Sequence, residues 1–536
     1  MTPLMPMEWM APLMFGALVV FMLLGYPVAF SLAALGLISG FASIELGYFE
    51  PAYMSNLPLR VFGILSNDLL LSIPFFTFMG AILERCGLAE DLLEGPGQLF
   101  GAVPGGLAYA VIIVGAILGA ITGTVAASVI AMGVISLPIM MRYGYDMKTA
   151  TGVIAASGTI TQLIPPSLVL VVLADQLGRS VGDMYLGAWG PSLLQIALFA
   201  LYTWFLTIIR PQDLPPVPRT LTGRPLLIKC MWGIIPAGVL IFLVLGTIML
   251  GLATPTEAGA LGTVGAIILA VLRNTQMQKM DRLAYIAGIV ATAGCLIASF
   301  TIGMKTLPFR ASFTVLFASI IWLCWRAWQD KPLHDLIVEG MRATMRITSM
   351  VAFIIVGATC FSIVFAGVDG NLWVEHGLTS LPGGVWGFLI AVNLLVFFLA
   401  FFLDFFEIAF IIVPMLAPVA QKLLTPVVGP DAALIWFGVM LCVNMQTSFM
   451  HPPFGFALFY LRSVIPKSIS SADIYWGAIP WVVLQLVMVA IVIFMPITVT
   501  FFLDKPHGID PSTVKIESAP PSEEDDLPPP SFGPPR

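Results

Sequence analysis

Two short stretches of sequence decide how this chain folds: Ser157–Ser167, which reads SGTITQLIPPS, and Asn444–Pro453, which reads NMQTSFMHPP. Each contains a Pro-Pro pair and lies between long apolar runs. A Pro-Pro pair removes two backbone N–H donors, and it drives the preceding residue out of the α-helical region. We therefore predict a broken helix at each stretch.

An interrupted apolar hairpin precedes each predicted break. Thr122-Gly123-Thr124 interrupts the first hairpin about 43 residues before Pro165, and Asp404-Phe405-Phe406-Glu407 interrupts the second about 48 residues before Pro452. Because the same order of features occurs twice, we infer an internal duplication. Paired interruptions in two halves of a membrane chain indicate a transporter binding site at the bilayer midplane.

The composition indicates that most of the chain lies in lipid. Of 536 residues, 59% are apolar and 10% are charged, and the mean hydropathy is +0.97. Apolar stretches of about 20 residues, the length that spans a bilayer, recur along almost the whole chain. We therefore predict an all-α polytopic membrane protein with inverted structural repeats, two re-entrant helical hairpins and two broken helices. The six scattered cysteines and four histidines predict no disulfide framework, haem or zinc site.

Four parts follow one another along the sequence. Residues 1–209 form the first repeat half with one hairpin and one broken helix. Residues 210–346 form linking helices, with an extra two-span insertion at about 273–346, and residues 347–503 form the second repeat half. Residues 504–536 contain nine prolines and an acidic run. They cannot bury enough apolar area to offset the entropy of ordering, so we predict a disordered tail.

Basic residues predict the orientation in the membrane. Lys and Arg collect at 210–229, 273–282 and 326–346, and short loops rich in these residues face the cytoplasm. We predict three cytoplasmic loops there, with an even number of spans between successive loops. The first apolar segment, at about 9–25, has no basic residues before it, so we interpret it as a retained helix and not as a signal peptide.

Polar groups at the interruptions are candidate ligands. Unwound backbone in hydrocarbon is tolerated only where protein or a water-filled cavity covers it. The freed carbonyls and nearby Thr and Ser hydroxyls can hold a small hard cation, and the new helix N-termini favour an anion. Asp404 and Glu407 lie between apolar runs, so they have either a role or an aqueous position, the alternative being a polar loop outside the membrane. His451 is either a ligand or a packing residue.

Taken in order, these motifs resemble the large membrane subunit of the tripartite ATP-independent periplasmic (TRAP) transporters, and most of all the branch labelled mannitol/chloroaromatic compound transport. The resemblance covers residues 10–272 and 347–503. Its motifs are Thr122–Ser128 with Leu137–Met140, Ser157–Ser167, Thr254–Ala258, Phe402–Ala409 with Val413-Pro414, and Pro452–Tyr460. Three positions depart from the family pattern: Thr122 replaces Ser, Thr161 replaces Gly and His451 replaces Thr.

The resemblance implies an elevator-type carrier in the bacterial inner membrane that takes up an organic anion, usually a carboxylate, together with sodium ions. It implies two protein partners, a small four-helix membrane subunit and a periplasmic solute-binding protein. We expect no cofactor other than sodium as coupling ion, and no nucleic-acid partner. The expected cation- and substrate-binding residues are Thr122, Gly123, Thr124, Ser128, Gly158, Thr159, Thr161, Pro165, Pro166, Ser167, Asp404, Glu407, Thr447, Ser448, His451, Pro452 and Pro453.

Other classes of membrane protein stay open. A membrane enzyme, or a subunit of an ion-pumping or antiporter complex, would carry several Lys, His and Glu residues in mid-membrane as a proton relay. Here the mid-membrane charges are almost limited to Asp404 and Glu407. A channel is the third class, but paired hairpins favour alternating access. We expect a transporter and no enzymatic activity, and the transported molecule cannot be inferred from this chain.

Overall fold

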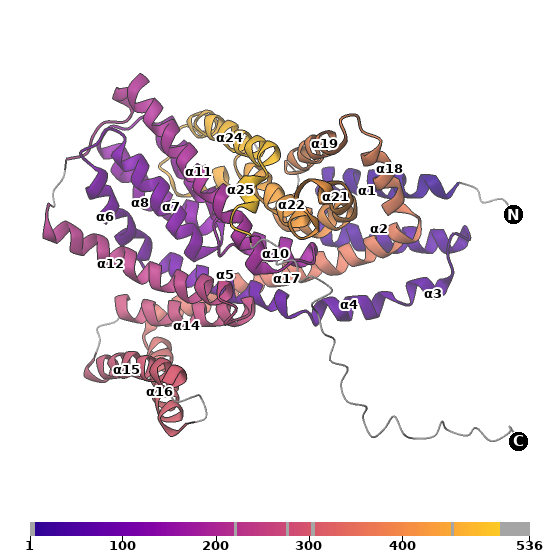
Figure 1. Cartoon of the computed structure of the whole chain (residues 1–536). Helices are drawn as coiled ribbons and strands as arrows, with labels where there is room; N and C mark the ends of the chain where they lie inside the picture. The colour runs from indigo at the N-terminus through magenta and orange to yellow at the C-terminus, as the bar shows by residue number, and fades with distance from the viewer. Residues whose placement is uncertain are drawn as a thin grey trace, which may run out of the picture. The chain divides into compact units, whose positions relative to one another are not determined.

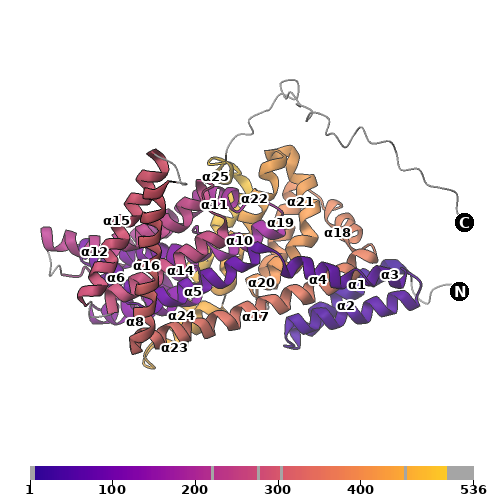
Figure 2. The ribbon, with the colours of Figure 1, turned by 90° about the horizontal axis from the view of Figure 1, so that it is seen from below.

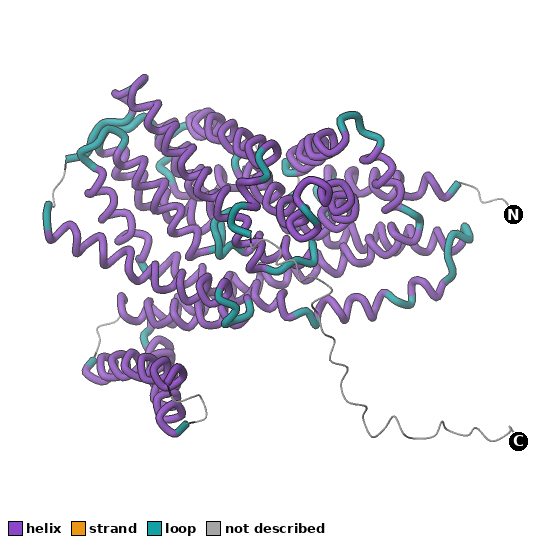
Figure 3. Tube along the Cα trace, viewed as in Figure 1, coloured by secondary structure: helices purple, strands orange, loops and turns teal. Residues whose placement is uncertain are grey.

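The computed structural model describes residues 6–218, 222–274, 278–301, 306–401, 403–451 and 455–503, and every regular element in these residues is a helix (Figure 3). The α-helices are α1 (Met10–Leu23), α2 (Val28–Glu45), α3 (Pro51–Met54), α4 (Leu57–Leu65), α5 (Asp68–Arg85), α6 (Leu88–Phe100), α7 (Gly106–Thr122), α8 (Val125–Arg142), α9 (Met147–Thr159), α10 (Leu168–Gln176), α11 (Val181–Ile209), α12 (Arg224–Ile241), α13 (Thr247–Met249), α14 (Pro255–Asn274), α15 (Lys279–Thr301), α16 (Leu307–Gln329), α17 (Lys331–Gly367), α18 (Gly370–Thr379), α19 (Gly384–Leu399), α20 (Phe405–Glu407), α21 (Val413–Val428), α22 (Pro430–Met445), α23 (Phe456–Val464), α24 (Ser471–Phe494) and α25 (Ile497–Thr500). Short 3-10 turns are η1 (Met7–Trp9), η2 (Ile160–Gln162), η3 (Pro211–Asp213) and η6 (Gln446–Phe449), and two π segments are η4 (Phe242–Gly246) and η5 (Ile408–Ile412).

Many of these helices are long and apolar enough to cross a membrane. Among the described residues there are 10 such helices, or up to 12 if each of two bent helix pairs is one span. Their exposed side chains include many large hydrophobic ones, which suit a lipid surround. The predicted class, an all-α polytopic membrane protein, is confirmed. The predicted tail at 504–536 lies outside the described residues.

Two repeat units stand out in the order of the elements. The first contains a hairpin of α7 and α8, a broken helix of α9, η2 and α10, and the long helix α11. The second contains a hairpin of α19 with α20, η5 and α21, a broken helix of α22, η6 and α23, and the long helix α24. In Figure 1 α10 lies beside α21 and α22, so segments far apart in the sequence meet at the middle of the protein.

The two broken helices run in opposite directions. The side chain of Arg179, just after α10, donates a hydrogen bond of 2.9 Å to the carbonyl of Pro430, where α22 begins. At the breaks themselves, Cys442 Sγ on α22 donates to the carbonyl of Gln162 at 3.3 Å. The end of one broken helix therefore lies beside the start of the other. This antiparallel arrangement agrees with the predicted inverted repeat.

Helices α2 and α17 pack against each other at very short range. A Cβ added to Gly36 on α2 would lie 2.6 Å from the backbone of Cys360, and one added to Gly357 on α17 would lie 2.3 Å from the carbonyl oxygen of Ala29. Small residues at such contacts let two membrane helices approach closely. This pair gives the rest of the fold a continuous, tightly packed support.

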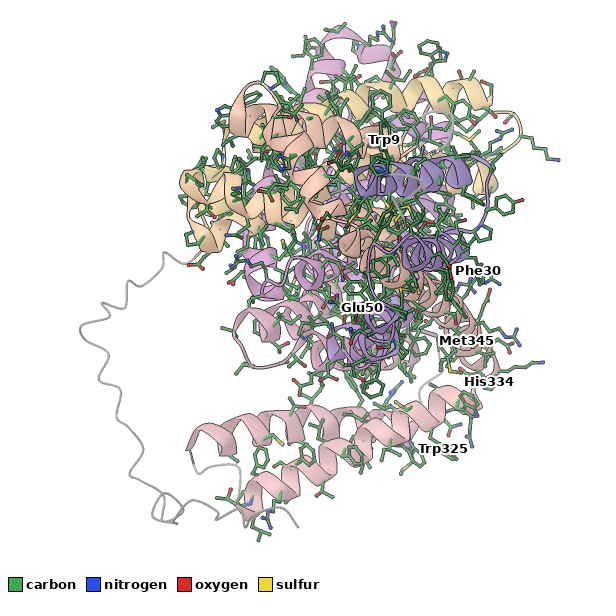
Figure 4. All side chains as sticks on the ribbon, turned by 90° about the vertical axis from the view of Figure 1, so that its right-hand side faces the viewer. Trp9, Phe30, Glu50, Trp325, His334 and Met345 are labelled. Atoms are coloured by element: carbon green, nitrogen blue, oxygen red, sulfur yellow. The ribbon has the colours of Figure 1, made fainter. Side chains whose placement is uncertain are left out.

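Helices α15 and α16 lie within residues 273–346, where two extra spans are predicted. They pack against each other and α16 packs against α14 (Figures 1 and 2). Figure 4 shows the pair side on, with Trp325 on α16. At one end of the pair, the buried carboxylate of Asp281 accepts hydrogen bonds from Trp322 Nε1 at 3.1 Å and Arg326 Nε at 3.3 Å. Hydrogen bonds to Asp281 therefore join the two helices in addition to their apolar contact.

Three parts of the sequence prediction need correction. The apolar run at about 61–83 in the sequence is not one straight segment: the helical stretches Pro51–Leu65 and Asp68–Arg85 are bent by 47°, because Asn67 caps a new helix by accepting from the N–H of Leu69 at 3.0 Å. The loop expected at 326–346 is helical from Lys331 onward. Pro332 lies in the first turn of α17, where proline is tolerated, and no later proline interrupts this 37-residue helix. Helix α18 was not predicted at all.

Candidate functional site

The first hairpin turns on a single glycine. Helix α7 ends at Thr122, Gly123 has a φ of +63°, and Thr124 is extended before α8 begins. Glycine adopts this left-handed conformation without the steric cost that other residues pay. The N–H of Gly123 donates to the carbonyl of Gly119 at 3.1 Å, which closes α7.

Three buried hydroxyl groups meet just behind this tip. Thr122 Oγ1 and Ser128 Oγ lie 2.9 Å apart, and Thr161 Oγ1 donates to Ser128 Oγ at 3.1 Å. All three side chains are at most 2% exposed. A hydroxyl has one proton but two acceptor lone pairs, so a cluster of hydroxyls retains unused acceptor capacity. Such oxygens are suited to a small hard cation.

The first broken helix fits closely against the first hairpin. A Cβ added to Gly119 would lie 2.8 Å from Thr161 Cα, and one added to Gly123 would lie 4.0 Å from the carbonyl oxygen of Pro166. Gly158 faces Val129, whose Cγ2 would lie 2.3 Å from an added Cβ, so this glycine serves close packing. The hairpin tip and the break therefore form one unit.

A new helix, α10, begins after the first break with Ser167 as its N-cap. The peptide between Pro165 and Pro166 is cis, and Ser167 then caps α10 by accepting from the N–H of Val169 at 3.2 Å. Ser167 Oγ also donates to the carbonyl of Gln162. The new N-terminus of α10 thus points into the protein interior, where its partial positive charge favours an anion or a polar ligand.

The second hairpin tip is a capping box. Asp404 Oδ1 accepts from the N–H of Glu407 at 2.9 Å, and Glu407 Oε2 accepts from the N–H of Asp404 at 3.0 Å. Both side chains are partly buried. One oxygen of each carboxylate is thus used to start the second arm of the hairpin. The two acids fix the tip and add negative charge to it.

The second break lies against the second hairpin. Thr447 Oγ1 donates to the carbonyl of Asn444 at 2.7 Å, and Ser448 Oγ donates to that of Met445 at 2.6 Å, so both hydroxyl oxygens keep their lone pairs. The rings of Phe405 and Phe449 lie 6.5 Å apart. Pro452 and Pro453 lie outside the described residues.

His451 is surrounded by aromatic rings. Its imidazole stacks on Phe401 at 4.4 Å and meets Phe397 edge-on at 4.3 Å. It is 3% exposed, and neither ring nitrogen has a hydrogen-bond partner among the described residues. The ring contacts are those of a packing residue and the two nitrogens are available as ligands, so both alternatives that the sequence left open stand.

The two breaks adjoin each other. Thr159 Oγ1 lies 3.6 Å from the sulfur of Met450, and Cys442 Sγ donates to the carbonyl of Gln162 at 3.3 Å. Gln485 on α24 donates to Thr159 Oγ1 at 2.9 Å. The structure therefore brings the two breaks together in the buried interior.

Three buried glutamines were not among the predicted site residues. Among the described residues, Gln162 and Gln446 have no hydrogen-bond partner for either amide atom, and Gln485 has none for Oε1. Each is at most 2% exposed. Buried amides are nearly always hydrogen-bonded, so these side chains are further candidate ligands beside the predicted residues. The sequence signal for these residues was a Gln inside an apolar helix. Such a residue is a candidate for a functional role in the same way as a charged residue inside an apolar helix.

Two hairpins and two antiparallel broken helices around a buried polar centre define a multi-pass membrane transport protein. Residues 15–498 match the family described as "Tripartite ATP-independent periplasmic transporter, DctM component". The chain belongs to this family. It is a bacterial TRAP transporter large permease and not an enzyme, as the sequence predicted.

Similar proteins carry related descriptions. The chain is 27% identical to the C4-dicarboxylate TRAP transporter large permease protein DctM of Pseudomonas aeruginosa, over 86% of this chain and 92% of that protein. It is 25% identical to the isethionate TRAP transporter permease protein DctMQ of Oleidesulfovibrio alaskensis, over 92% of this chain and 66% of that protein. Among solved structures, the YdaH transporter of Alcanivorax borkumensis is similar over 91% of this chain and 99% of that chain, with 15% identity and a TM-score of 0.41.

Proposed function

We propose that this chain is the transport-carrying subunit of a sodium-coupled uptake system for a small organic anion. The observation that carries this proposal is the buried hydroxyl cluster of Thr122, Ser128 and Thr161, at the point where a hairpin tip meets a broken helix. Unwound backbone and hydroxyl oxygens at such breaks are typical sodium ligands in secondary transporters. The hydroxyls of Thr447 and Ser448 supply the equivalent groups in the second half.

The substrate class is supported by the relatives. One is described as a transporter of C4-dicarboxylates and another of isethionate, which are carboxylate and sulfonate anions. We propose that the substrate here is also a small organic anion, most simply a carboxylate. Within the family, we propose the mannitol/chloroaromatic branch, on the motifs Phe402–Ala409 and Pro452–Tyr460.

The partners follow from the family. The relative described as DctMQ is longer than this chain, which covers 66% of it. We propose that the uncovered part corresponds to a small membrane subunit that is a separate protein here, and that a periplasmic binding protein delivers the substrate. In this scheme the system lies in the inner membrane, and the two hairpins move as an elevator against α2 and α17.

Reconstitution tests the proposal. The chain is placed in liposomes with its two partners, and uptake of dicarboxylates and sulfonates is measured while sodium, proton and electrical gradients are imposed one at a time. We expect uptake only with an inward sodium gradient and with both partners present. Uptake that persists with sodium absent on both sides, or full uptake by this chain alone, would contradict it.

A further inference from the structure

A cavity of about 460 Å³ lies between helices that belong to different parts of the fold. Its walls come from α4 and the turn before α5, the end of α10, the middle of α17, and the segment from η5 into α21. Its volume lies in the range of small-molecule sites, which are mostly apolar with a few convergent polar groups. The polar side chains in its wall are Arg60, Asn67, Asp175, Gln176, Thr359 and Ser362.

Arg60 supplies the positive charge of this cavity. Its side chain is exposed, and within the described parts of the chain it takes part in neither an ion pair nor a side-chain hydrogen bond. A guanidinium has five donors in a planar fork that matches a carboxylate or a sulfonate. An unpaired arginine facing a cavity in a membrane protein therefore marks a site for an anion.

Asp175 forms no ion pair with Arg60 among the described residues. Asp175 Oδ1 accepts from Asn67 Nδ2 at 2.7 Å and Oδ2 accepts from Gln176 Nε2 at 2.9 Å, so both of its oxygens already have donors. Its charge still weakens the binding of any anion nearby. A ligand with one anionic group toward Arg60 and a hydrogen-bonding, uncharged end toward Asp175 fits this pair better than a compact dianion does.

The cavity lies on the side from which substrate would arrive. Helix α11 starts next to the end of α10 and runs for 29 residues to Ile209, about 43 Å at 1.5 Å per residue, which is enough to cross the bilayer. It ends at the basic segment 210–229, which is predicted to be cytoplasmic. The end of α10, and with it the cavity, is then on the periplasmic side. Phe410 in its wall comes six residues after Asp404, about 9 Å along the hairpin.

We propose that this cavity is a binding site for the transported organic anion, with Arg60 as the ligand of its carboxylate or sulfonate group. The proposal rests on the proposed function for the identity of the anion. The charge selectivity of the cavity is a separate property, which can be measured without transport. It is therefore distinguishable from a failure of sodium coupling.

Thiol labelling with charged reagents measures that selectivity. Ser362→Cys places a thiol in the cavity wall, in a full-length chain whose two partly exposed cysteines are replaced by Cys295→Ser and Cys324→Ser. The other four cysteines are buried. The anionic probe is sulfonatoethyl methanethiosulfonate, itself an organic sulfonate, and the cationic probe is the trimethylammonium analogue. The measured quantity is the ratio of the two labelling rates, anionic over cationic.

We expect Arg60→Gln to lower this ratio at least about tenfold, since a charge in the wall of the same cavity acts on the two probes with opposite signs. Arg60→Lys should keep most of the ratio, and Asp175→Asn should raise it. A thiol introduced by Ser380→Cys, exposed and outside the cavity, should show no dependence on Arg60. A thiol at position 362 that reacts with neither probe, or a ratio that ignores Arg60, overturns the proposal.

A lipid headgroup is the other possible anion. The same rates are therefore measured in neutral detergent and in vesicles that contain phosphatidylglycerol. We expect the ratio to depend on Arg60 in both. If the dependence disappears in the vesicles, a lipid phosphate occupies Arg60 and the proposed substrate site is wrong.

Discussion

The side-chain amide of Asn67 donates a hydrogen bond of 2.7 Å to the carboxylate of Asp175. Asn67 immediately precedes α5, whereas Asp175 lies near the end of the first broken helix, 108 positions later in the sequence. Asn67 also caps α5. One side chain thus sets the bend between α4 and α5 and ties that bend to the repeat that carries the candidate cation site.

Exchanging the two residues tests whether the hydrogen bond between Asn67 and Asp175 stabilises the protein. Asn67→Asp keeps the cap but puts a second carboxylate beside Asp175, so we expect it to destabilise the protein. Asp175→Asn alone loses a charge-assisted hydrogen bond. The double variant restores one amide and one acid, and a thermal-unfolding cycle in detergent should show a coupling of about 1–2 kcal/mol in its favour. Strictly additive effects would mean that the bond contributes nothing to stability.

Asp404 is expected to act on sodium binding through its charge. Asp404→Asn keeps a residue that can cap α20 but removes the negative charge at the hairpin tip. We expect the variant to fold normally, while its apparent sodium affinity in the uptake assay falls at least about tenfold, roughly 1.4 kcal/mol. Asp404→Ala, which loses the cap as well, is the comparison. If Asp404→Asn retains wild-type sodium dependence and only Asp404→Ala is impaired, the role is capping alone.

The hydroxyl cluster predicts a sodium effect that needs no transport assay. A ligand that binds the folded state raises its stability with concentration, so added sodium should raise the melting temperature of the wild-type protein. Thr161→Val keeps the side-chain shape but removes the hydroxyl that bonds Ser128. We expect the sodium-induced shift to be strongly reduced, whereas Thr161→Ser should preserve it. An equal shift in Thr161→Val and wild type would place the cation elsewhere.

Gly119 is expected to be intolerant of any side chain. A Cβ there would lie 2.8 Å from the backbone of Thr161, so the hairpin and the broken helix would have to move apart. We expect Gly119→Ala to cost about 1–3 kcal/mol, as overpacking does in closely packed sites, and to reduce the sodium-induced shift as well. Gly238→Ala is the matched control, since no atom lies within 4 Å of its added Cβ. A neutral Gly119→Ala would show that the contact is loose.

Sequence reasoning located the interruptions well because their causes are local. A proline pair breaks a helix whatever surrounds it. Gly123 between two threonines likewise predicts a turn. The convergence of the two breaks was also predictable, from the duplication. The contact of Thr159 with Gln485 was not, because it depends on how α24 packs against α9.

The misses have a common physical origin. Periodicity and hydropathy report on faces and lengths, but not on side-chain caps inside an apolar run. The bend at Asn67 depends on one such cap. The stretch at 331–346 looked like a loop because of its charges, yet an exposed helix carries charges as readily. Roles of Asp404 and Thr447 as cation ligands stay predictions.

The length of α17 has a mechanical consequence. Its 37 residues rise about 55 Å, nearly twice the roughly 30 Å of a hydrocarbon core. Its buried apolar residues are concentrated from Val351 onward, while Lys331, Arg342 and Arg346 lie in the first half. The helix is therefore longer than a bilayer core is thick, and it packs along α2 through the close contacts at Gly36 and Gly357. In the proposed elevator motion, the hairpins would therefore move past a helix that is longer than the membrane core is thick.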